Sequence, residues 1–262
     1  MRLQSLILTA MLLIPHIAAA QFEGEISTKI TTRHSGGGSG KLYLSKLGTR
    51  NEIDFNSPKL QGVSTGPYRI VTIQKFAEPD LVYHLNEERK TYSILDLKKI
   101  GNQTKGFNDE TYTVKRLGVD TVAGYACEKA LLSSQHGTET EMCIAKSIRG
   151  MEAWVTMMER TAQVKSGMFK ALKDAGLEGL PVKMIMRRKG EDSPIMTMEV
   201  VQAEQKPLSV TLFEVPSSYQ KEDIISSFAT PEMAEKLNGF MNKMTPEQRK
   251  IYEGMKNRMM GR

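Results

Sequence analysis

The sequence predicts a mainly β protein with helices, an α+β chain built on a curved antiparallel half-barrel sheet. Two observations favour this fold. Strand-like segments follow one another from residue 21 to residue 148, and a longer segment of helical periodicity interrupts the series at 151–174. Strands in series, without alternating helices, are typical of a meandering sheet that curls on itself. We expect one long helix to cover that sheet and a helical tail to follow it.

The first half of the chain supplies most of the predicted strands. In residues 21–32, Phe22, Ile26 and Ile30 share one parity, and polar residues occupy the other. A two-residue period of this kind indicates a half-buried strand. The glycine-rich run 35–40 is interpreted as a flexible loop. The other expected strands in this half are 41–47, 50–55, 68–75, 81–86, 90–95, 110–117, 121–133 and 138–144.

The covering helix is predicted at residues 151–174. Its apolar positions recur at helical spacing, and Gly176 is suited to end it. The seam consists of Met151, Val155, Met158, Ala162, Phe169 and Leu172. Because this apolar face is broad, it needs an apolar partner, and the concave face of the sheet is the natural one. Strands are then expected again at 182–189, 195–204 and 209–215.

Residues 220–262 are expected to form a helical C-terminal tail. Thr230-Pro231 and Thr245-Pro246 each combine a helix-capping residue with a proline suited to the first helical position. Gln248 completes a capping-box pattern with Thr245. The two short helices that follow carry many charges and few apolar residues. We therefore expect an appendage to a main domain at 21–219, and not a second domain with its own core.

Residues 1–20 have the three-part pattern of a secretory signal peptide. Arg2 precedes an apolar block that is too short to span a bilayer, and the segment ends on small residues at Ala20. The alternative is a buried N-terminal helix or a retained anchor. Gln21 follows the predicted cleavage site, and because it is not cysteine, lipid attachment there is not indicated. We expect a periplasmic protein, cleaved near Ala20 and Gln21.

The two cysteines, Cys127 and Cys143, are predicted to form a disulfide. An even cysteine count in an exported chain favours this pairing. Strand-like segments flank a turn at Gln135 and His136, and folding this hairpin places the two cysteines opposite each other or one residue from opposite. A redox-active pair is the weaker alternative, because the C-x-x-C spacing is absent. We interpret the disulfide as structural.

Charge and motifs exclude several classes of function. The formal net charge of +6 is spread along the chain, without a nucleic-acid recognition motif, so no nucleic-acid partner is expected. Weak attraction to an anionic membrane surface, as a peripheral contact, is compatible with it. The run Gly36 to Lys41 lacks the spacing and the Ser or Thr of a phosphate-binding loop. No histidine pair, nucleophile motif or carboxylate constellation stands out, so we expect no enzyme, no metal and no cofactor.

Methionine is unusually frequent, with 17 in the chain. Thioethers can hold copper(I), and the methionines of the tail could gather into such a cluster. Alternation of methionine at 184, 186, 196 and 198 along strands instead fits side-chain packing. A third use is an adaptable apolar lining for a cavity that accepts varied hydrophobic ligands.

Three motifs resemble a known family. They are Val122-Ala123-Gly124-Tyr125-Ala126-Cys127-Glu128-Lys129, Gly179-Leu180-Pro181-Val182-Lys183 and Leu212-Phe213-Glu214-Val215-Pro216-Ser217-Ser218-Tyr219. Together with Phe22-Glu23-Gly24 they resemble domain-of-unknown-function family 4412, which is similar in fold to the LolA/LolB periplasmic lipoprotein carriers. The resemblance implies an open half-barrel whose apolar face shelters acyl chains. Two departures are Met142-Cys143, where relatives often have tryptophan, and Ser217-Ser218, where glycine is common.

The leading functional hypothesis is a non-enzymatic periplasmic protein that binds a lipid or another hydrophobic group between sheet and helix. A lipid, an acyl chain or a lipoprotein is then the expected partner. The expected lining residues are Trp154, Met157, Met158, Phe169, Met184 and Met186. The same residues could instead fill a closed core. The alternative function is an envelope interaction or stress protein that acts through its methionine-rich tail, with or without a soft metal.

Overall fold

The computed structural model describes residues 22–33, 36–55, 59–60, 63–64, 68–98, 111–148 and 167–223, together with 239, 242–250 and 254 near the C-terminus. The predicted signal peptide at 1–20 and most of the predicted tail lie outside these residues. In the tail, Thr245 and Gln248 form the predicted capping box. The backbone N–H of Gln248 donates to Thr245 Oγ1 at 3.2 Å, and the backbone N–H of Thr245 donates to Gln248 Oε1 at 3.0 Å.

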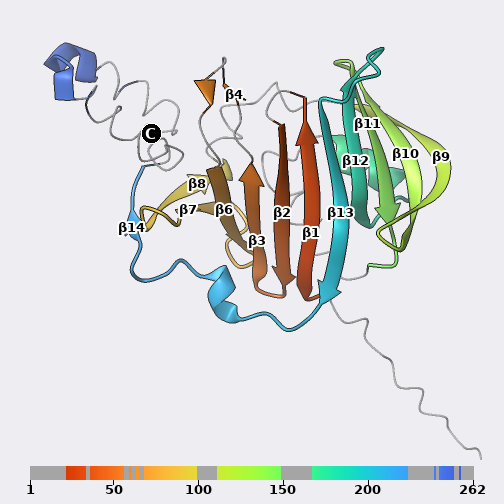
Figure 1. Ribbon diagram of the computed structural model, residues 1–262, viewed down its shortest axis with the longest axis horizontal. Coiled ribbons are helices and arrows are strands. Elements are labelled where there is room, and N and C mark those ends of the chain that lie inside the picture. The colour runs from red at the N-terminus through yellow and green to blue at the C-terminus, as the bar shows by residue number, and fades with distance from the viewer. Residues whose placement is uncertain are drawn as a thin grey trace, which may run out of the picture.

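One 12-stranded sheet contains most of the described chain (Figure 1). Its strand order is β14-β8-β7-β6-β3-β2-β1-β13-β12-β11-β10-β9. The N-terminal strands are β1 Gly24–Thr32, β2 Gly36–Ser45, β3 Gly48–Phe55, β6 Tyr68–Lys75, β7 Leu81–Asn86 and β8 Thr91–Asp96. The others are β9 Tyr112–Val122, β10 Tyr125–Ser134, β11 Thr138–Ala145, β12 Leu180–Arg188, β13 Met196–Gln205 and β14 Gln220–Lys221.

A small two-stranded sheet and two short helices also belong to the described fold. The strands β4 (Lys59–Leu60) and β5 (Val63–Ser64) pair with each other in a separate two-stranded sheet. Helix α3 spans Gly167–Asp174, and the 3-10 helix η2 spans Val210–Phe213. After β13, the chain runs along one end of the sheet through η2 to β14 at the far edge (Figure 1).

The predicted fold class, an antiparallel half-barrel covered by one long helix, was wrong. The sheet is mixed, because β14 returns across the molecule and pairs with β8 in parallel. It is also open, with β14 and β9 as its two edges. Within the described chain no long helix covers it, since α3 has eight residues and buries only Leu172 deeply, whereas 151–166 lie outside the description. Helical spacing of apolar residues indicated a continuous helix but could not fix its length.

Two segments fold differently from the local prediction because neighbouring strands decide their conformation. The glycine run predicted as a loop belongs to β2, where β1 and β3 hydrogen-bond to it on both sides. The predicted strand 121–133 is instead divided by a tight turn at Ala123 and Gly124, whose φ angles are 49° and 82°. Positive φ at both positions is the pattern of a type I′ hairpin turn. Likewise, η2 replaces the strand predicted at 209–215.

Two hydrophobic layers lie on opposite faces of the sheet. On one face, Leu172 and Leu177 pack against Ala130, Leu132 and Met142 of the strands beneath α3. On the other face, the segment between β13 and β14 covers the N-terminal strands. There, two residues of that segment, Val215 and Tyr219, pack against Val71, Ile73 and Leu85. The sheet therefore has a face that carries α3 and an opposite face where part of the C-terminal strap, residues 206–223, packs on the N-terminal strands.

The predicted disulfide between Cys127 and Cys143 is confirmed, with Cα atoms 5.3 Å apart. Both residues are buried, and they join β10 to β11. The residue directly opposite Cys143 is Lys129, so the cysteines are two residues from opposite, whereas the prediction placed them opposite or one residue from opposite. Their Cα separation nevertheless falls within the usual range for a disulfide.

Candidate functional site

A cavity of about 410 Å³ lies between the sheet and α3. Residues of β1, β2 and β3 form one part of its wall, and residues of β11, β12, β13 and α3 form the other. The lining residues are Ile26, Thr28, Ile30, Gly40, Lys41, Leu42, Asn51, Glu52, Ile53, Met142, Met168, Phe169, Leu180, Pro181, Met184, Met198 and Val200. Most of these side chains are apolar, so the cavity is suited to a hydrophobic ligand.

The register of the sheet explains why these residues share a face. In a strand, every second side chain points to the same side. Ile26 lies opposite Leu42 in β2, and Thr28 lies opposite both Gly40 in β2 and Val200 in β13. The half-buried strand predicted at 21–32 therefore supplies the centre of the cavity wall.

Gly40 leaves part of the cavity floor without a side chain. A Cβ atom at this position would lie 2.6 Å from Thr28 Oγ1 and 3.6 Å from Ile30 Cδ1, two atoms of the lining. The Thr28 hydroxyl donates to the Gly40 carbonyl at 3.3 Å, which fixes the hydroxyl against the floor. Glycine within a strand often marks a place where another group approaches the backbone closely.

The structure places the six predicted lining residues in three different situations. Phe169 and Met184 line the cavity. Met186 lies one row farther along β12, opposite Met196, and is not among the lining residues. Trp154, Met157 and Met158 lie outside the described residues.

Sequence reasoning missed most of the cavity wall. The residues contributed by β1, β2, β3 and β13 meet there only because β1 pairs with β13, a strand from the distant part of the chain. Their two-residue periodicity indicated a buried face. It carried no information on which strands would be neighbours.

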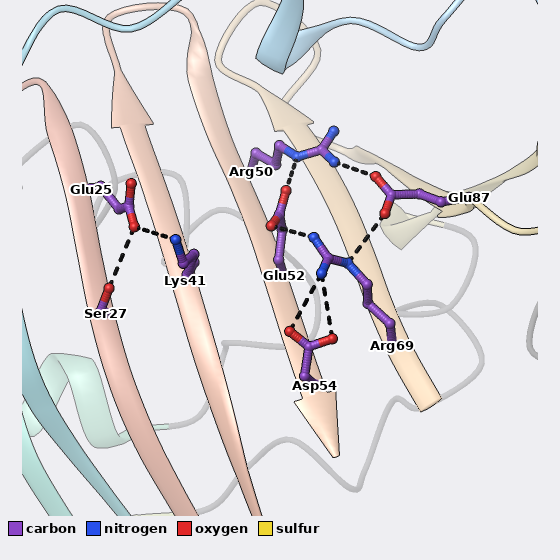
Figure 2. Close-up of polar contacts among 8 residues, drawn as sticks. All are labelled: Glu25, Ser27, Lys41, Arg50, Glu52, Asp54, Arg69 and Glu87. Carbon is purple, nitrogen blue, oxygen red and sulfur yellow. Dashed lines mark hydrogen bonds and ion pairs between the residues drawn. The ribbon is translucent and has the colours of Figure 1, made fainter. Parts of the chain in front are cut away.

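The charged groups beside the cavity are bound on the opposite face of the sheet. Lys41 Nζ lies 2.8 Å from Glu25 Oε1, and the two side chains point toward each other in Figure 2. Hydrogen bonding from Lys41 lowers the pKa of the Glu25 carboxyl against the opposing effect of burial, and Lys206 adds to the lowering. The Lys41 ammonium is therefore already paired outside the cavity.

An ionic network on β3, β6 and the β7–β8 turn stabilises the same region. Arg50 Nε lies 2.6 Å from Glu52 Oε1, and Arg69 Nη2 lies 2.6 Å from Glu52 Oε2 (Figure 2). Glu87 is ion-paired with both arginines, at 2.7 Å from Arg50 Nη2 and 3.2 Å from Arg69 Nε. Asp54 is the outer member, 3.5 Å from Arg69. Every charge near this part of the wall has an opposite charge beside it.

A second hollow, of about 250 Å³, is polar. It is lined in part by Asp120, Lys129, Glu141, Cys143 and Lys183. Lys129 Nζ lies 3.2 Å from Glu141 Oε1 and 3.8 Å from Asp120 Oδ2, so opposite charges lie beside one another in this hollow. The part of the chain that the structure describes holds no group of three or more His, Cys, Asp or Glu side chains suited to a metal ion. In that same part, no helix is long and apolar enough to cross a membrane.

Most of the chain matches the model of one protein family. The model of DUF4412, a domain of unknown function, matches residues 22–219. The chain belongs to the DUF4412 family. The match confirms the resemblance drawn from the sequence motifs, and it spans the strands that build the cavity. A comparison with curated proteins finds no match.

Solved structures with some likeness to this DUF4412 protein share little sequence with it. An uncharacterized conserved protein from Thermus thermophilus is 11% identical, with a TM-score of 0.43 over 77% of this chain and 91% of that chain. The MucA/MucB complex of Pseudomonas aeruginosa contains a chain that is 9% identical, with a TM-score of 0.41 over 75% of this chain and 56% of that chain. The present protein thus spans little more than half of that neighbour, and no function is transferred from it.

Proposed function

We propose that this DUF4412 protein is an exported, non-enzymatic binding protein that holds a lipid acyl chain or another hydrophobic group in the cavity beneath α3. The observation that carries the proposal is the cavity itself. Ligand pockets in proteins commonly have volumes of roughly 300–1,000 Å³ and a mostly apolar wall. The cavity, at about 410 Å³, falls in the lower part of this range, which suits one chain better than a bulky lipid.

The size of the cavity argues against a closed, fully packed core. Protein interiors are packed to the density of organic crystals, and most of their voids are no larger than a water molecule. One water occupies roughly 30 Å³ of liquid. The hollow is far larger than such a void and partly open to solvent, so its apolar wall, including Ile26, Ile30, Leu42 and Val200, is left in contact with water. An apolar ligand would remove that surface from water.

Export to the periplasm belongs to the same proposal. Disulfides persist in oxidising compartments, and the bridge between Cys127 and Cys143 is compatible with such a compartment. The signal-peptide pattern of residues 1–20 supports the same location. We further propose that residues 21–219 form the binding domain, together with β14 (Gln220–Lys221), which pairs with β8, and that the rest of 220–262 forms a tail outside it.

A fluorescent apolar probe tests the binding proposal. N-phenyl-1-naphthylamine is uncharged and brightens when it enters an apolar site. Titration of the purified protein should show saturable binding of the probe. The substitution Ile53→Trp places a larger side chain at a half-buried lining position and should abolish that binding.

The matched control is Val119→Trp, because Val119 is 81% exposed on β9 and is not a lining residue. This variant should bind the probe as the wild type does. Absence of binding to the wild type would overturn the proposal. Equal binding by the wild type and Ile53→Trp, with both proteins folded by circular dichroism, would overturn it as well.

A further inference from the structure

Methionines gather at one end of the cavity in a way that the sequence did not reveal. Met142 of β11 lies directly opposite Met184 of β12, and Met184 lies directly opposite Met198 of β13. The three side chains therefore form a transverse row across three neighbouring strands. Met168 of α3 lines the same cavity. Four thioethers from four elements thus surround one space.

The spacing of this row allows the sulfur atoms to meet. Directly opposed residues on neighbouring antiparallel strands have Cβ atoms about 4.5–5.5 Å apart. Methionine is unbranched and has three rotatable side-chain bonds, so sulfurs from both flanks can reach a point above Met184. Met142 is almost fully buried, whereas Met168, Met184 and Met198 are half-buried and border the hollow. These half-buried thioethers keep access to the cavity.

Methionine is confined to this end of the lining. The wall formed by β1, β2 and β3 uses Ile26, Ile30, Leu42 and Ile53 for the same purpose of apolar contact. Packing alone is satisfied by such branched side chains, which have fewer rotamers than methionine. Concentration of four thioethers around one space adds a chemical property that the rest of the wall lacks, namely soft and uncharged donor atoms.

We infer that Met142, Met184 and Met198, with Met168, form a binding site for a soft monovalent cation, copper(I). Thioether ligands select copper(I), whereas magnesium, calcium and manganese require oxygen ligands that this row does not offer. The nearest lysine of the lining, Lys41, has its ammonium paired with Glu25 and does not compete for the site. This site adds a second class of ligand to the proposed hydrophobic cavity.

Copper(I) titration in anaerobic buffer, with acetonitrile as a weak competing ligand, tests the inference. The wild type should bind one equivalent of copper(I) in the presence of acetonitrile. The double variant Met184→Leu/Met198→Leu keeps apolar side chains but removes two sulfurs from the row. It should lose this binding. Binding of N-phenyl-1-naphthylamine by the wild type, measured separately, distinguishes failure of the metal site from failure of the hydrophobic cavity.

The matched control is Met186→Leu/Met196→Leu, a directly opposed pair one row farther along the same strands and outside the cavity lining. This control should bind copper(I) as the wild type does. The inference is overturned if the wild type binds none. It is also overturned if both double variants retain equal binding, which would assign copper(I) to methionines elsewhere, or if both lose it equally.

Discussion

Arg50 and Glu52 form a buried ion pair on β3, with Arg50 Nε 2.6 Å from Glu52 Oε1. Their side chains are only 10% and 9% exposed. The residues that alternate with them, Asn51 and Ile53, line the cavity on the other face of the strand. The ion pair therefore helps to fix the strand that carries part of the cavity wall.

Removal of the Glu52 charge should destabilise the fold strongly. The substitution Glu52→Gln leaves Arg50 buried with only Glu87 as a counter-charge and should cost about 3 kcal/mol of unfolding free energy. The matched control is Glu87→Gln, at a side chain that is 38% exposed, and it should cost less than about 1 kcal/mol. Urea unfolding followed by circular dichroism measures both. Equal costs for the two variants would contradict the burial argument.

Stability should fall as the pH drops from about 6.5 to about 4, because of His84. Burial, with a smaller contribution from Arg89, lowers the pKa of His84 to about 4. The unfolded chain takes up the proton near pH 6.5, whereas the folded chain resists it until about pH 4, so protonation favours unfolding within that window. The loss is roughly 3 kcal/mol and levels off below pH 4.

The variant His84→Gln isolates this effect. Carboxylates such as Glu25, whose pKa is lowered, also titrate in the acid range, but they are common to both proteins. The difference in unfolding free energy between wild type and variant should therefore change with pH between about 6.5 and 4. A constant difference across that range would show that His84 is not responsible.

The turn between β9 and β10 offers a stabilising substitution. Ala123 has a φ of 49°, a left-handed conformation that costs an ordinary L-residue about 1–2 kcal/mol. Asparagine tolerates this region better, and Asn-Gly is a preferred pair for type I′ turns. Ala123→Asn should raise the unfolding free energy by up to about 1 kcal/mol in urea. Ala123→Val, with a β-branched side chain, should lower it, and the opposite order would refute the turn assignment.

The disulfide should contribute about 3 kcal/mol to stability. It closes a loop with a sequence separation of 16, for which chain entropy predicts a value of this size. The double substitution Cys127→Ala/Cys143→Ala should lower the urea midpoint accordingly. Dithiothreitol should lower the wild-type midpoint and leave that of the double variant unchanged. An unchanged wild-type midpoint under full reduction would count against a stabilising bridge.

Local sequence patterns predicted the bounds of some strands. Strands β6 and β7 begin and end at the predicted residues, and the covalent link between Cys127 and Cys143 was also foreseen. The prediction failed where a neighbour decides the conformation. Glycines 36–38 and 40 have little strand preference of their own, yet hydrogen bonds from β1 and β3 hold them in β2.

The candidate site was less predictable than the strands. Two of its residues, Phe169 and Met184, were named from the sequence because they belong to strongly apolar segments. Met198 and Ile53 reach the cavity through the order and register of β13 and β3, which depend on pairing between distant parts of the chain. Hydrophobic periodicity indicates which face of a strand is buried, but not which strands pair with it.

Native mass spectrometry of the protein purified from the envelope fraction of producing cells tests whether the cavity holds a ligand. The wild type and Val119→Trp should each carry one hydrophobic molecule, released by organic solvent and identifiable by its mass. Ile53→Trp should remain folded, and its measured mass should be that of the polypeptide alone. A bare mass for all three proteins, or the same bound molecule on Ile53→Trp, would contradict a ligand-binding cavity beneath α3.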